Sequence, residues 1–458
     1  MTRSVTRRRL LRPVALVLAM AGLGLLVCRQ STAAEVPVNM RSLIERTQSF
    51  GLGKFPISFW SYTHLREHSQ YMTEEEVEEW ADAGFTVPQS PSFDPVDPEH
   101  KAHMLRLLDW AQARGMKLII CDPRCHYRPL KLGTDGRAPE EYTQGVRAAV
   151  ADFGNHPATF GFHVGDEPGS EDKDAFFACY RAQKEAAPDL HPFANLLPYF
   201  PGIEARAGAE NWPAYLDEYV GESKADLISY DCYAQMNPGQ GGWNNYYENL
   251  RLYREAALRN GVPFWNTVLS VGHFRYRCPN LDEIRWQFNT TIASGAHGLL
   301  WFFYYMRQPH ANYRMSPVDE LWDRTQTYYD IRRVQQNFHR HYGDLFTRIV
   351  ATRVTFFPEP FGGGDKFTPN GLLSKVAPDH ADHPILIGEF VDLQGRRYVM
   401  IVNNSMADSV HVDVTFPGAD ARVFSWNWRG QEYEGAAYSG SGRQQRDEAG
   451  LTIGHWLA

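Results

Sequence analysis

Short apolar runs alternate with amphipathic helical segments along most of this chain, and that alternation limits the folds it can adopt. Eight such runs lie between residues 55 and 303, and each is followed by a segment with the apolar spacing of a helix. Strands that alternate with helices in this way form a parallel sheet covered by helices. The runs are residues 55–60, 85–87, 117–121, 159–164, 192–197, 226–230, 263–269 and 298–303.

The number of strand–helix units favours one form of that sheet. Eight units within roughly 290 residues predict a (β/α)8 TIM barrel, and we place it over residues 35–345. The alternative is an open doubly wound sheet. The first apolar run, however, is not followed by the glycine-rich turn that binds phosphate in many such folds. The predicted fold class is therefore α/β, with a barrel as the main domain.

The pattern changes after residue 345. Four segments there alternate with period two, and turn sequences such as Pro417-Gly418 separate them. They are residues 354–357, 385–391, 397–402 and 410–414. This pattern predicts a small all-β sandwich domain over residues 346–458. Its last strand reaches Ala458, so we expect the natural chain to continue beyond that residue.

Residues 1–34 have the three parts of an export signal. Arg7-Arg8-Arg9 lie in a basic segment, an apolar run follows, and Ser31-Thr32-Ala33-Ala34 form a cleavage site. The apolar run is shorter than the roughly 20 residues that a membrane-spanning helix needs. The string from Thr6 to Arg12 resembles a bacterial twin-arginine signal, and an ordinary secretory signal is the alternative. We expect an exported, periplasmic or extracellular protein without a membrane span.

Composition excludes several classes of function. The 458 residues include 54 acidic and 46 basic ones, a formal charge of −8, and this balance argues against nucleic acid as a partner. Aromatic residues make up 13% of the chain, which suits a pocket that stacks against flat apolar faces. Paired Cys-x-x-Cys motifs are absent, as are Gly-x-Ser-x-Gly and His-Glu-x-x-His. No metal and no cofactor is expected.

Residues that follow the strands are the candidates for a functional site, because active sites of barrels lie at the carboxyl ends of the strands. Several of these ends carry carboxylates, and others carry aromatic clusters. Carboxylates for acid–base work and flat faces for rings are typical of a sugar site. The candidates are Trp60, Asp122, Arg124, His126, Asp166, Glu167, Asn195, Tyr230, Asp231, Tyr233, His273 and Trp301, with Trp243 in a glycine-rich loop after the sixth run.

Asp166 and Glu167 form the most informative pair. Pro168-Gly169 forces a turn directly after them, so both carboxylates are expected at the mouth of the barrel. Adjacent carboxylates repel each other, and a raised pKa on one of them suits a general acid near neutral pH. An acidic residue at a helix N-terminus is the alternative interpretation. Two acids directly after an apolar strand favour the catalytic one.

The chain resembles glycoside hydrolases that combine a (β/α)8 barrel with a C-terminal β-sandwich, over roughly residues 50–458. In many of those retaining enzymes the acid/base Glu ends strand four, and Glu167 matches that place. The same families have a nucleophilic Glu at the end of strand seven, whereas residues 264–273 contain no carboxylate. The resemblance therefore implies a general acid/base but no ordinary nucleophile.

A second resemblance accommodates that difference. The adjacent Asp166-Glu167 pair is similar to family 20 and family 123 hexosaminidases, and Tyr230-Asp231 with Trp301 is similar to family 18 chitinases. There the substrate's own acetamido oxygen is the nucleophile. The resemblance implies that Asp166 orients that group, Glu167 is the acid/base and Tyr230 or Tyr233 supplies a hydroxyl. It also implies that Trp301 forms the pocket floor.

Other roles for these residues stay open. Asp231 or Asp122 is an alternative second carboxylate for Glu167, and strand alternation sends Tyr230 and Asp231 to opposite faces. Arg124 is predicted either to bind substrate or to pair with Asp122.

The remaining strand-end candidates are expected to line the cleft or to bind hydroxyls. His126 has a loop hydrogen bond as its alternative role, and Trp243 has a loop anchor. The predicted function is an exported glycoside hydrolase acting on an oligo- or polysaccharide. The alternative is a non-catalytic carbohydrate-binding protein on the same scaffold.

Overall fold

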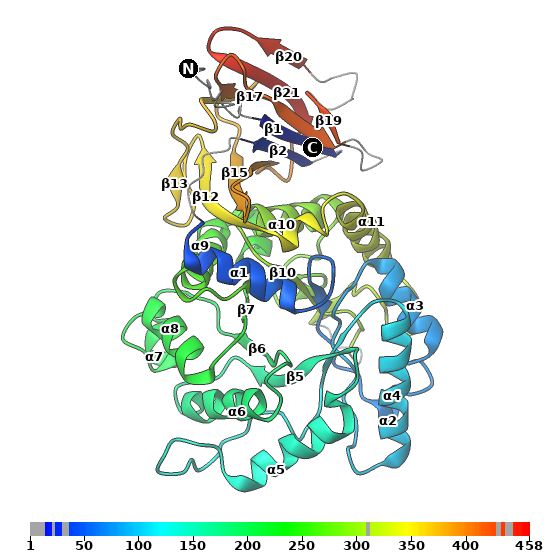
Figure 1. The fold of residues 1–458 in the computed structure, drawn as a ribbon. Helices are drawn as coiled ribbons and strands as arrows, with labels where there is room; N and C mark the ends of the chain where they lie inside the picture. Colours follow the sequence, from blue (N-terminus) through cyan, green and yellow to red (C-terminus); the bar gives the residue numbers. More distant parts are fainter. Residues whose placement is uncertain (1–13, 21–22, 30–35, 308–311, 427–431, 436–442) are drawn as a thin grey trace, which may run out of the picture. The chain divides into compact units, whose positions relative to one another are not determined.

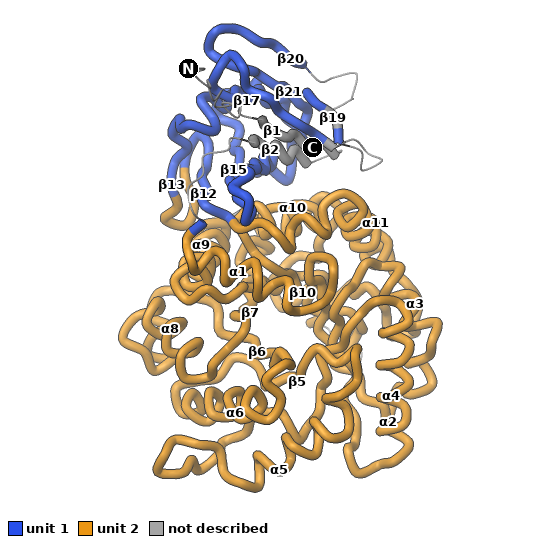
Figure 2. The backbone as a smooth tube through the Cα atoms, viewed as in Figure 1, with its two compact units in different colours: residues 1–36, 351–359, 365–458 blue, residues 37–350, 360–364 orange. Residues whose placement is uncertain are grey.

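The computed structural model describes residues 14–20, 23–29, 36–307, 312–426, 432–435 and 443–458 (Figure 1). The chain divides into two units (Figure 2). Unit 1 consists of residues 1–36, 351–359 and 365–458, and unit 2 consists of residues 37–350 and 360–364. Within the described ranges no helix has the length and apolar character needed to cross a membrane.

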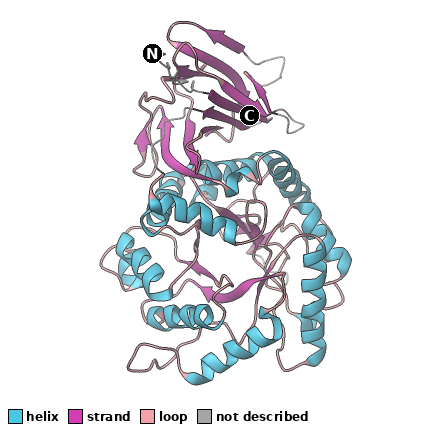
Figure 3. Cartoon of the chain, in the orientation of Figure 1, coloured by secondary structure: helices cyan, strands magenta, loops and turns pink. Residues whose placement is uncertain are grey.

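Unit 2 is built on a sheet of seven parallel strands in the order β3-β10-β8-β7-β6-β5-β4. Helices lie outside this sheet (Figure 3). The strands are β3 (Ile57–Phe59), β4 (Leu118–Ile120), β5 (Thr159–Asp166), β6 (Phe193–Leu196), β7 (Ile228–Asp231), β8 (Phe264–Leu269) and β10 (Gly298–Phe302). The expected α/β class, a parallel sheet with outer helices as in α/β barrels, is confirmed.

The second predicted strand, residues 85–87, is not a regular strand. Residues 86–90 nevertheless run between β3 and β4, because Gln89 donates its backbone N–H to Phe59 and Ser90 donates to Ile119. Pro88 has no N–H to contribute to a ladder. The Thr86 hydroxyl accepts the backbone N–H of Ile57 instead. A side chain and a proline thus replace regular ladder bonds at this position.

The helices agree with the predicted segments and add three that the sequence pattern did not reveal. The additional ones are α1 (Val38–Ser49), α2 (Leu65–His68) and α7 (Ile203–Ala207). The others are α3 (Glu74–Ala83), α4 (Pro98–Ala113), α5 (Glu140–Ala149), α6 (Lys173–Ala186), α8 (Trp212–Ser223), α9 (Trp243–Asn260), α10 (Leu281–Ala293) and α11 (Gln326–His341). The π-turn η1 (Val150–Gly154) follows α5, and short 3-10 turns η2 (Ala234–Met236), η3 (Pro238–Gln240) and η4 (Leu345–Thr347) lie elsewhere.

Local signals explain the helix ends. The Thr73 hydroxyl accepts the backbone N–H of Glu76 at the start of α3, and Gly84 ends that helix with φ 92°. Asn280 and Glu283 form a reciprocal capping box at the start of α10.

Aromatic side chains fill the inside of the sheet at the end away from the strand carboxyl termini. Trp265 of β8 lies 5.9 Å from Phe193 of β6 and 5.6 Å from Phe160 of β5, measured between ring centroids. Phe50, directly after α1, packs edge-on against Phe160 and Trp265. These rings belong to one buried cluster. Trp265 is therefore a core residue.

Unit 1 contains two mainly antiparallel sheets. One has the order β13-β12-β15-β16-β2-β18-β19, with β1 paired to β2, and the other has the order β14-β17-β21-β20. Side chains from both sheets, such as Ile387 and Val412, belong to one apolar cluster. The strands are β12 (Ile349–Phe357), β13 (Asp365–Lys366), β14 (Lys375–Pro378), β15 (Ile385–Asp392), β16 (Arg397–Asn403), β17 (Val410–Pro417), β18 (Val423–Trp426), β19 (Glu432–Glu434), β20 (Arg443–Arg446) and β21 (Gly450–Leu457).

The N-terminal segment contributes a hairpin to the first of these sheets. β1 (Val14–Met20) pairs with β2 (Leu23–Arg29), and β2 pairs antiparallel with β16. The predicted cleavage site at residues 31–34 and the arginines of residues 7–9 lie outside the described residues. Removal of this segment on export stays a prediction.

Candidate functional site

The site is centred on the end of β5, where the backbone leaves the regular strand. Gly165 has φ 153°, and a Cβ there would lie 2.2 Å from the Tyr127 ring, so only glycine fits. Glu167 has φ 41°, which is rare for a residue with a long side chain and disfavoured before a proline such as Pro168. Strained conformations of this kind concentrate at functional sites.

Asn195 links two carboxylates from neighbouring strands. Its Nδ2 donates to Oδ1 of Asp166 at 3.0 Å and to Oδ1 of Asp231 at 2.9 Å. The two oxygens are therefore less than 6 Å apart. The strand register explains the contact, because Asp166 pairs with Asn195 and Asn195 pairs with Ser229 across β5, β6 and β7. The Ser229 hydroxyl lies 3.5 Å from Asn195 Oδ1, which fixes the orientation of the amide.

The three carboxylates of Asp166, Glu167 and Asp231 all have raised pKa values. Partial desolvation in the cleft raises the pKa of Asp166, although its side chain keeps access to solvent. Burial and then repulsion from Asp166 raise the pKa of Glu167. Burial, followed by repulsion from both neighbours, raises the pKa of Asp231 well above its usual range. Groups that interact in this way take up protons as a unit.

Two further side chains temper that repulsion. Arg206 of α7 lies 3.7 Å from Oε2 of Glu167, and its charge opposes the rise in the Glu167 pKa. Tyr233 lies beside Asp231, and its hydroxyl also opposes the rise in that residue's pKa. Glu167 and Asp231 also repel each other, and this repulsion raises the pKa of Asp231 further. The cluster therefore holds at least one proton more readily than isolated carboxylates do.

Aromatic rings surround the carboxylates. Phe302, at the end of β10, lies 5.3 Å from Tyr233 and 6.5 Å from Trp60 between ring centroids. The Tyr62 ring follows at 6.1 Å from Phe302, and 38% of Tyr62 is exposed. His273 lies 5.2 Å from Phe302, and burial lowers its pKa to about 4. The rings form walls on which the flat face of a sugar can pack.

A pocket of about 530 Å³ opens beside Asp166. Trp60, Tyr62, His126 and His163 line it. The His163 ring packs edge-on against Trp60 at 5.0 Å, and burial lowers the His163 pKa to about 3. The volume of this pocket lies within the range of small-molecule sites.

Seven of the predicted residues therefore meet around this cleft, together with Asn195. Trp60, His126, Asp166, Glu167, Asp231, Tyr233 and His273 line it or contact those that do. His126 also bonds through Nδ1 to the Tyr127 carbonyl. Both N–H groups of Asn195 are used by carboxylates, so it holds them rather than a substrate.

Tyr230 and Trp301 do not join the cleft. Tyr230 is fully buried and stacks on Tyr253 of α9 at 3.8 Å, in the layer between sheet and helices. Trp301 is fully buried too, and its Nε1 donates to Gln335 of α11 at 2.9 Å. Successive strand residues point to opposite faces, so the neighbouring positions face the cleft instead. The expectation that Trp301 forms the pocket floor is therefore wrong, and Phe302, the next residue, lies among the aromatic rings of the site instead.

Three other predicted residues have structural partners. Arg124 holds Asp122 through Nη2 at 2.7 Å and Asp152 through Nη1 at 2.8 Å, so the ion-pair interpretation of Asp122 and Arg124 applies. Asp122 also borders the pocket beside Asp166, but its side chain is fully buried in this pair. Trp243 is buried against Trp286 at 5.0 Å, which makes it a core residue rather than a stacking platform.

Four further residues belong to the site although they were not predicted from the sequence: Tyr62, His163, Arg206 and Phe302. Tyr62 and Phe302 carried a usable signal, since both follow or end predicted strands. Arg206 lies on α7, a helix with no clear periodic pattern, and nothing in the sequence points to its contact with Glu167. Among the residues that the structure describes, no cluster of three or more His, Cys, Asp or Glu has the geometry of a metal site.

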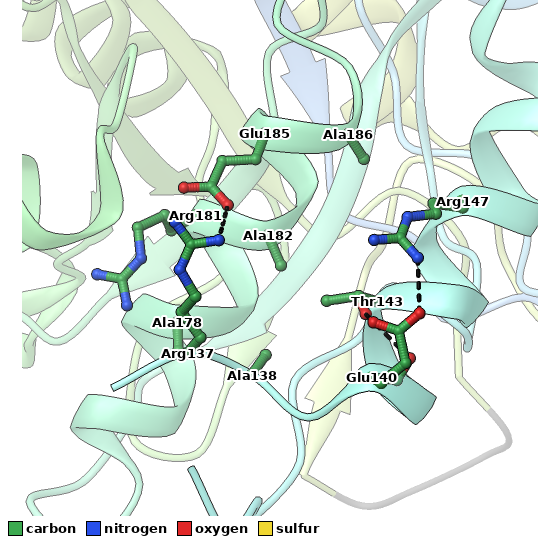
Figure 4. A pocket seen from close by; sticks show the side chains of 10 residues that line it. All are labelled: Arg137, Ala138, Glu140, Thr143, Arg147, Ala178, Arg181, Ala182, Glu185 and Ala186. Carbon is green, nitrogen blue, oxygen red and sulfur yellow. Dashed lines mark hydrogen bonds and ion pairs between the residues drawn. The ribbon is translucent and has the colours of Figure 1, made fainter. Parts of the chain in front are cut away.

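A second hollow lies away from this cleft, between α5 and α6 (Figure 4). Its volume is about 200 Å³. Its arginines have carboxylate partners: Arg147 bonds to Glu140 at 2.7 Å, and Arg137 lies 3.6 Å from Glu185. These pairs satisfy the charges that line the hollow, so it offers no reactive group.

Comparison with known proteins identifies the fold. No protein-family model matches the chain, and no curated protein matches it. Among solved structures, a β-galactosidase from Rahnella sp. R3 is similar, with a TM-score of 0.51, 12% identity and coverage of 70% of this chain and 60% of that one. A β-galactosidase from Bacillus circulans sp. alkalophilus matches with TM-score 0.49, 12% identity and coverage of 66% and 58%.

A glucosidase from Croceicoccus marinus matches with TM-score 0.42, 14% identity and coverage of 72% and 92%. The chain spans about three fifths of the length of the β-galactosidases it matches. At 12% identity the Rahnella structure shows a shared fold. The expected resemblance to barrel glycoside hydrolases is confirmed at that level, and the resemblance to hexosaminidases stays a prediction.

Proposed function

We propose that the protein is a glycoside hydrolase that uses Glu167 as its general acid/base. The observation that carries the proposal is the cluster of Asp166, Glu167 and Asp231, held through Asn195 at the strand ends and walled by aromatic rings. The raised pKa of Glu167 shifts loss of its proton toward neutral pH, which suits a group that protonates a leaving oxygen. The fold shared with a β-galactosidase supports this class of reaction by analogy.

In this proposal Glu167 donates its proton to the glycosidic oxygen as the bond to the anomeric carbon breaks. A second carboxylate then meets the positive charge that develops on the sugar. Asp231 is one candidate. Asp166 is the other, as the group that orients an acetamido substituent. Tyr233, which contacts Asp231, supplies the hydroxyl in that second scheme.

The spacing favours retention of configuration. Inverting enzymes need roughly 6.5–9.5 Å between the carboxyl groups, to leave room for a water. Asp166 and Asp231 share one amide, with their oxygens less than 6 Å apart, and Glu167 follows Asp166 directly in the chain, so the cluster is tighter than that. We therefore expect the first-formed product to keep the anomeric configuration of the substrate, as NMR of early product would detect.

Hydrolysis of a panel of aryl glycosides, with and without a 2-acetamido group, tests the proposal. Wild type, Glu167→Gln and the control Glu141→Gln are compared, because the Glu141 side chain is 89% exposed on α5. We expect turnover by wild type and control and a loss of at least ~100-fold in Glu167→Gln. Cleavage confined to acetamido sugars supports Asp166 as the orienting group. Cleavage of plain glycosides supports Asp231.

A Glu167→Gln variant with near wild-type turnover contradicts the acid/base assignment. Oligosaccharide binding by a wild type that cleaves nothing favours the alternative, a carbohydrate-binding protein on this scaffold. The absence of a carboxylate from β8 is the observation behind that alternative.

We also propose export of the mature chain to the periplasm or beyond, on the basis of the basic, apolar and small-residue segments of residues 1–34. N-terminal sequencing of protein recovered from the periplasmic or extracellular fraction tests this, with Glu35 expected as the first residue. An intact N-terminus on protein confined to the cytoplasm contradicts it.

A further inference from the structure

A second pocket adjoins the cleft. Its volume is about 400 Å³, and Tyr62 and Thr63 line both this pocket and the one beside Asp166. The two pockets therefore adjoin at the segment after β3. Volumes of this size are sufficient for a small ligand or one unit of a longer one.

Arg307 is the feature that distinguishes this pocket. Its guanidinium lies 4.1 Å above the centroid of the Tyr62 ring and 5.8 Å from that of Tyr313. Nη1 is 3.4 Å from the Tyr313 hydroxyl. A guanidinium that stacks on a ring keeps its N–H edge available for in-plane hydrogen bonds. In the described part of the chain, no carboxylate lies within ion-pairing distance of Arg307.

The other hollow provides a direct contrast. Arg137 and Arg147 there each have a carboxylate partner, as Figure 4 shows. Arg307 instead lies in an acidic protein and next to a cleft with three carboxylates. Arg307 does not pair with these carboxylates, because the cation in contact with Glu167 is Arg206. The position suits a guanidinium that binds an external anion.

The remaining lining is aromatic and hydroxyl-bearing. Tyr305 and His68 line the pocket, and both contact Trp322 at its border, with ring centroids 4.9 and 5.4 Å apart. Trp322 stacks on Tyr71 at 4.2 Å and has φ 69°, a conformation that a bulky residue adopts only under constraint. These rings provide flat surfaces for a sugar ring. Glu67 also lines the pocket, and it is exposed to solvent.

We propose that this pocket is a subsite for an acidic sugar unit whose carboxylate or sulfate group is bound by Arg307. The inference rests on the proposed function for the idea that the ligand is a glycan. It goes further in assigning a negative charge to the unit next to Tyr62. Planar carboxylate and sulfate edges accept two parallel N–H bonds from a guanidinium, which a neutral hydroxymethyl group does not. The substrate is therefore an anionic oligosaccharide.

Calorimetric titration of three matched trisaccharides tests this subsite. One carries a glucuronate unit, the second has the same unit reduced to glucose, and the third carries glucose 6-sulfate. The Glu167→Gln protein is used, so that the ligands stay intact. Arg307→Gln and Arg307→Lys are added to that protein in turn, and Arg147→Gln serves as the control, since Arg147 pairs with Glu140 in the other hollow. Thermal melting verifies that each variant is folded.

We expect at least one acidic trisaccharide to bind about 10-fold or more tightly than the neutral one. The preference should vanish in Arg307→Gln, weaken in Arg307→Lys and persist in Arg147→Gln. It should also fall at high salt. Binding of the glucuronate ligand alone, the sulfate ligand alone or both identifies the anion.

Equal affinity for acidic and neutral ligands overturns the proposal, as does a preference that survives Arg307→Gln. Absence of binding by all three ligands overturns it too, because the pocket adjoins the cleft. The aryl glycoside assay separates this from the proposed function. Acidic ligands that bind without any wild-type hydrolysis leave the subsite standing and refute the hydrolase. Hydrolysis by wild type without a preference for acidic ligands supports the hydrolase and refutes the subsite.

Discussion

Replacement of Asn195 by alanine removes the amide that both Asp166 and Asp231 share. Each lost hydrogen bond to a carboxylate is worth about 1.5–3 kcal/mol. That energy corresponds to about one to two pKa units for a buried group. Asp231, which has less solvent contact, should show a shift of this size, and Asp166 a smaller one, because solvent compensates part of the loss. Both shifts are upward, since the amide stabilises the charged forms.

The assay is the pH dependence of kcat/KM on the best aryl glycoside. The acidic limb reports the carboxylate that must be ionised, so it moves to higher pH by about one unit. In the active form these carboxylates are ionised, so the repulsion that raises the pKa of Glu167 after burial stays in place. The basic limb, which reports loss of the acid's proton, therefore keeps its position. The bell narrows from its acidic side, and its apparent pKa values belong to the cluster as a whole.

Asn260→Ala is the matched control. Asn260 also donates to a carboxylate, at 2.6 Å from Asp217, but the pair lies between α9 and α8. The Asn260→Ala substitution also removes a hydrogen bond to a carboxylate, and it should leave the pH profile of kcat/KM unchanged. A bell of unaltered width in a fully active Asn195→Ala protein would falsify the bridging role of Asn195. A stability loss shared by both variants carries no information about the site.

Three stability measurements test other parts of the structure. Burial and a neighbouring carboxylate raise the pKa of Glu167, so its contribution to folding stability is fully present below the unfolded pKa and is lost as pH rises. Glu167→Gln should therefore raise Tm by about 1–3 °C at pH 7 and not at pH 4. A gain at both pH values refutes the repulsion. Burial lowers the pKa of His297 to about 4, so its contribution to folding stability is lost as pH falls below about 6.5. In urea unfolding, the fall in the free energy of unfolding between pH 7 and pH 5 should be roughly 2 kcal/mol smaller in His297→Gln than in wild type. An unchanged pH dependence contradicts this. Buried Glu76 accepts a hydrogen bond from Arg324, so Glu76→Gln should lower the free energy of unfolding in urea by about 3 kcal/mol. The control Glu74→Gln, at a side chain that is 55% exposed, should lower it by less than about 0.5 kcal/mol. Similar losses in both variants refute the buried ion pair.

Sequence pattern identified the strand ends but not the face to which each residue points. Apolar runs define a strand to within a residue or two, whereas orientation reverses at every residue. That is why Asp231 reaches the cleft while Tyr230 packs against α9, and why Phe302 rather than Trp301 faces the carboxylates. The error is one residue in each case, and it decides whether a side chain meets substrate or core.

Long-range contacts were beyond the sequence argument for a different reason. Arg206 meets Glu167 from a helix of five residues, and Trp243 is buried by Phe361, more than a hundred residues away. Residues 86–90 occupy a strand position through a hydroxyl and a few backbone bonds, which no periodicity reveals. Contacts of this kind depend on which loops the fold brings together, and local propensity carries no record of that.

The backbone at the end of β5 explains how two adjacent residues both serve one site. In a regular strand Asp166 and Glu167 would point to opposite faces, and only one would reach the cleft. Gly165 at φ 153° and Glu167 at φ 41° break that alternation immediately before and after Asp166. Both carboxylates then interact with Asp231, and repulsion raises the pKa values of Glu167 and Asp231 beyond what burial does. The strain and two of the three carboxylates lie within residues 165–167, which is expected where a fold is shaped for chemistry rather than for stability.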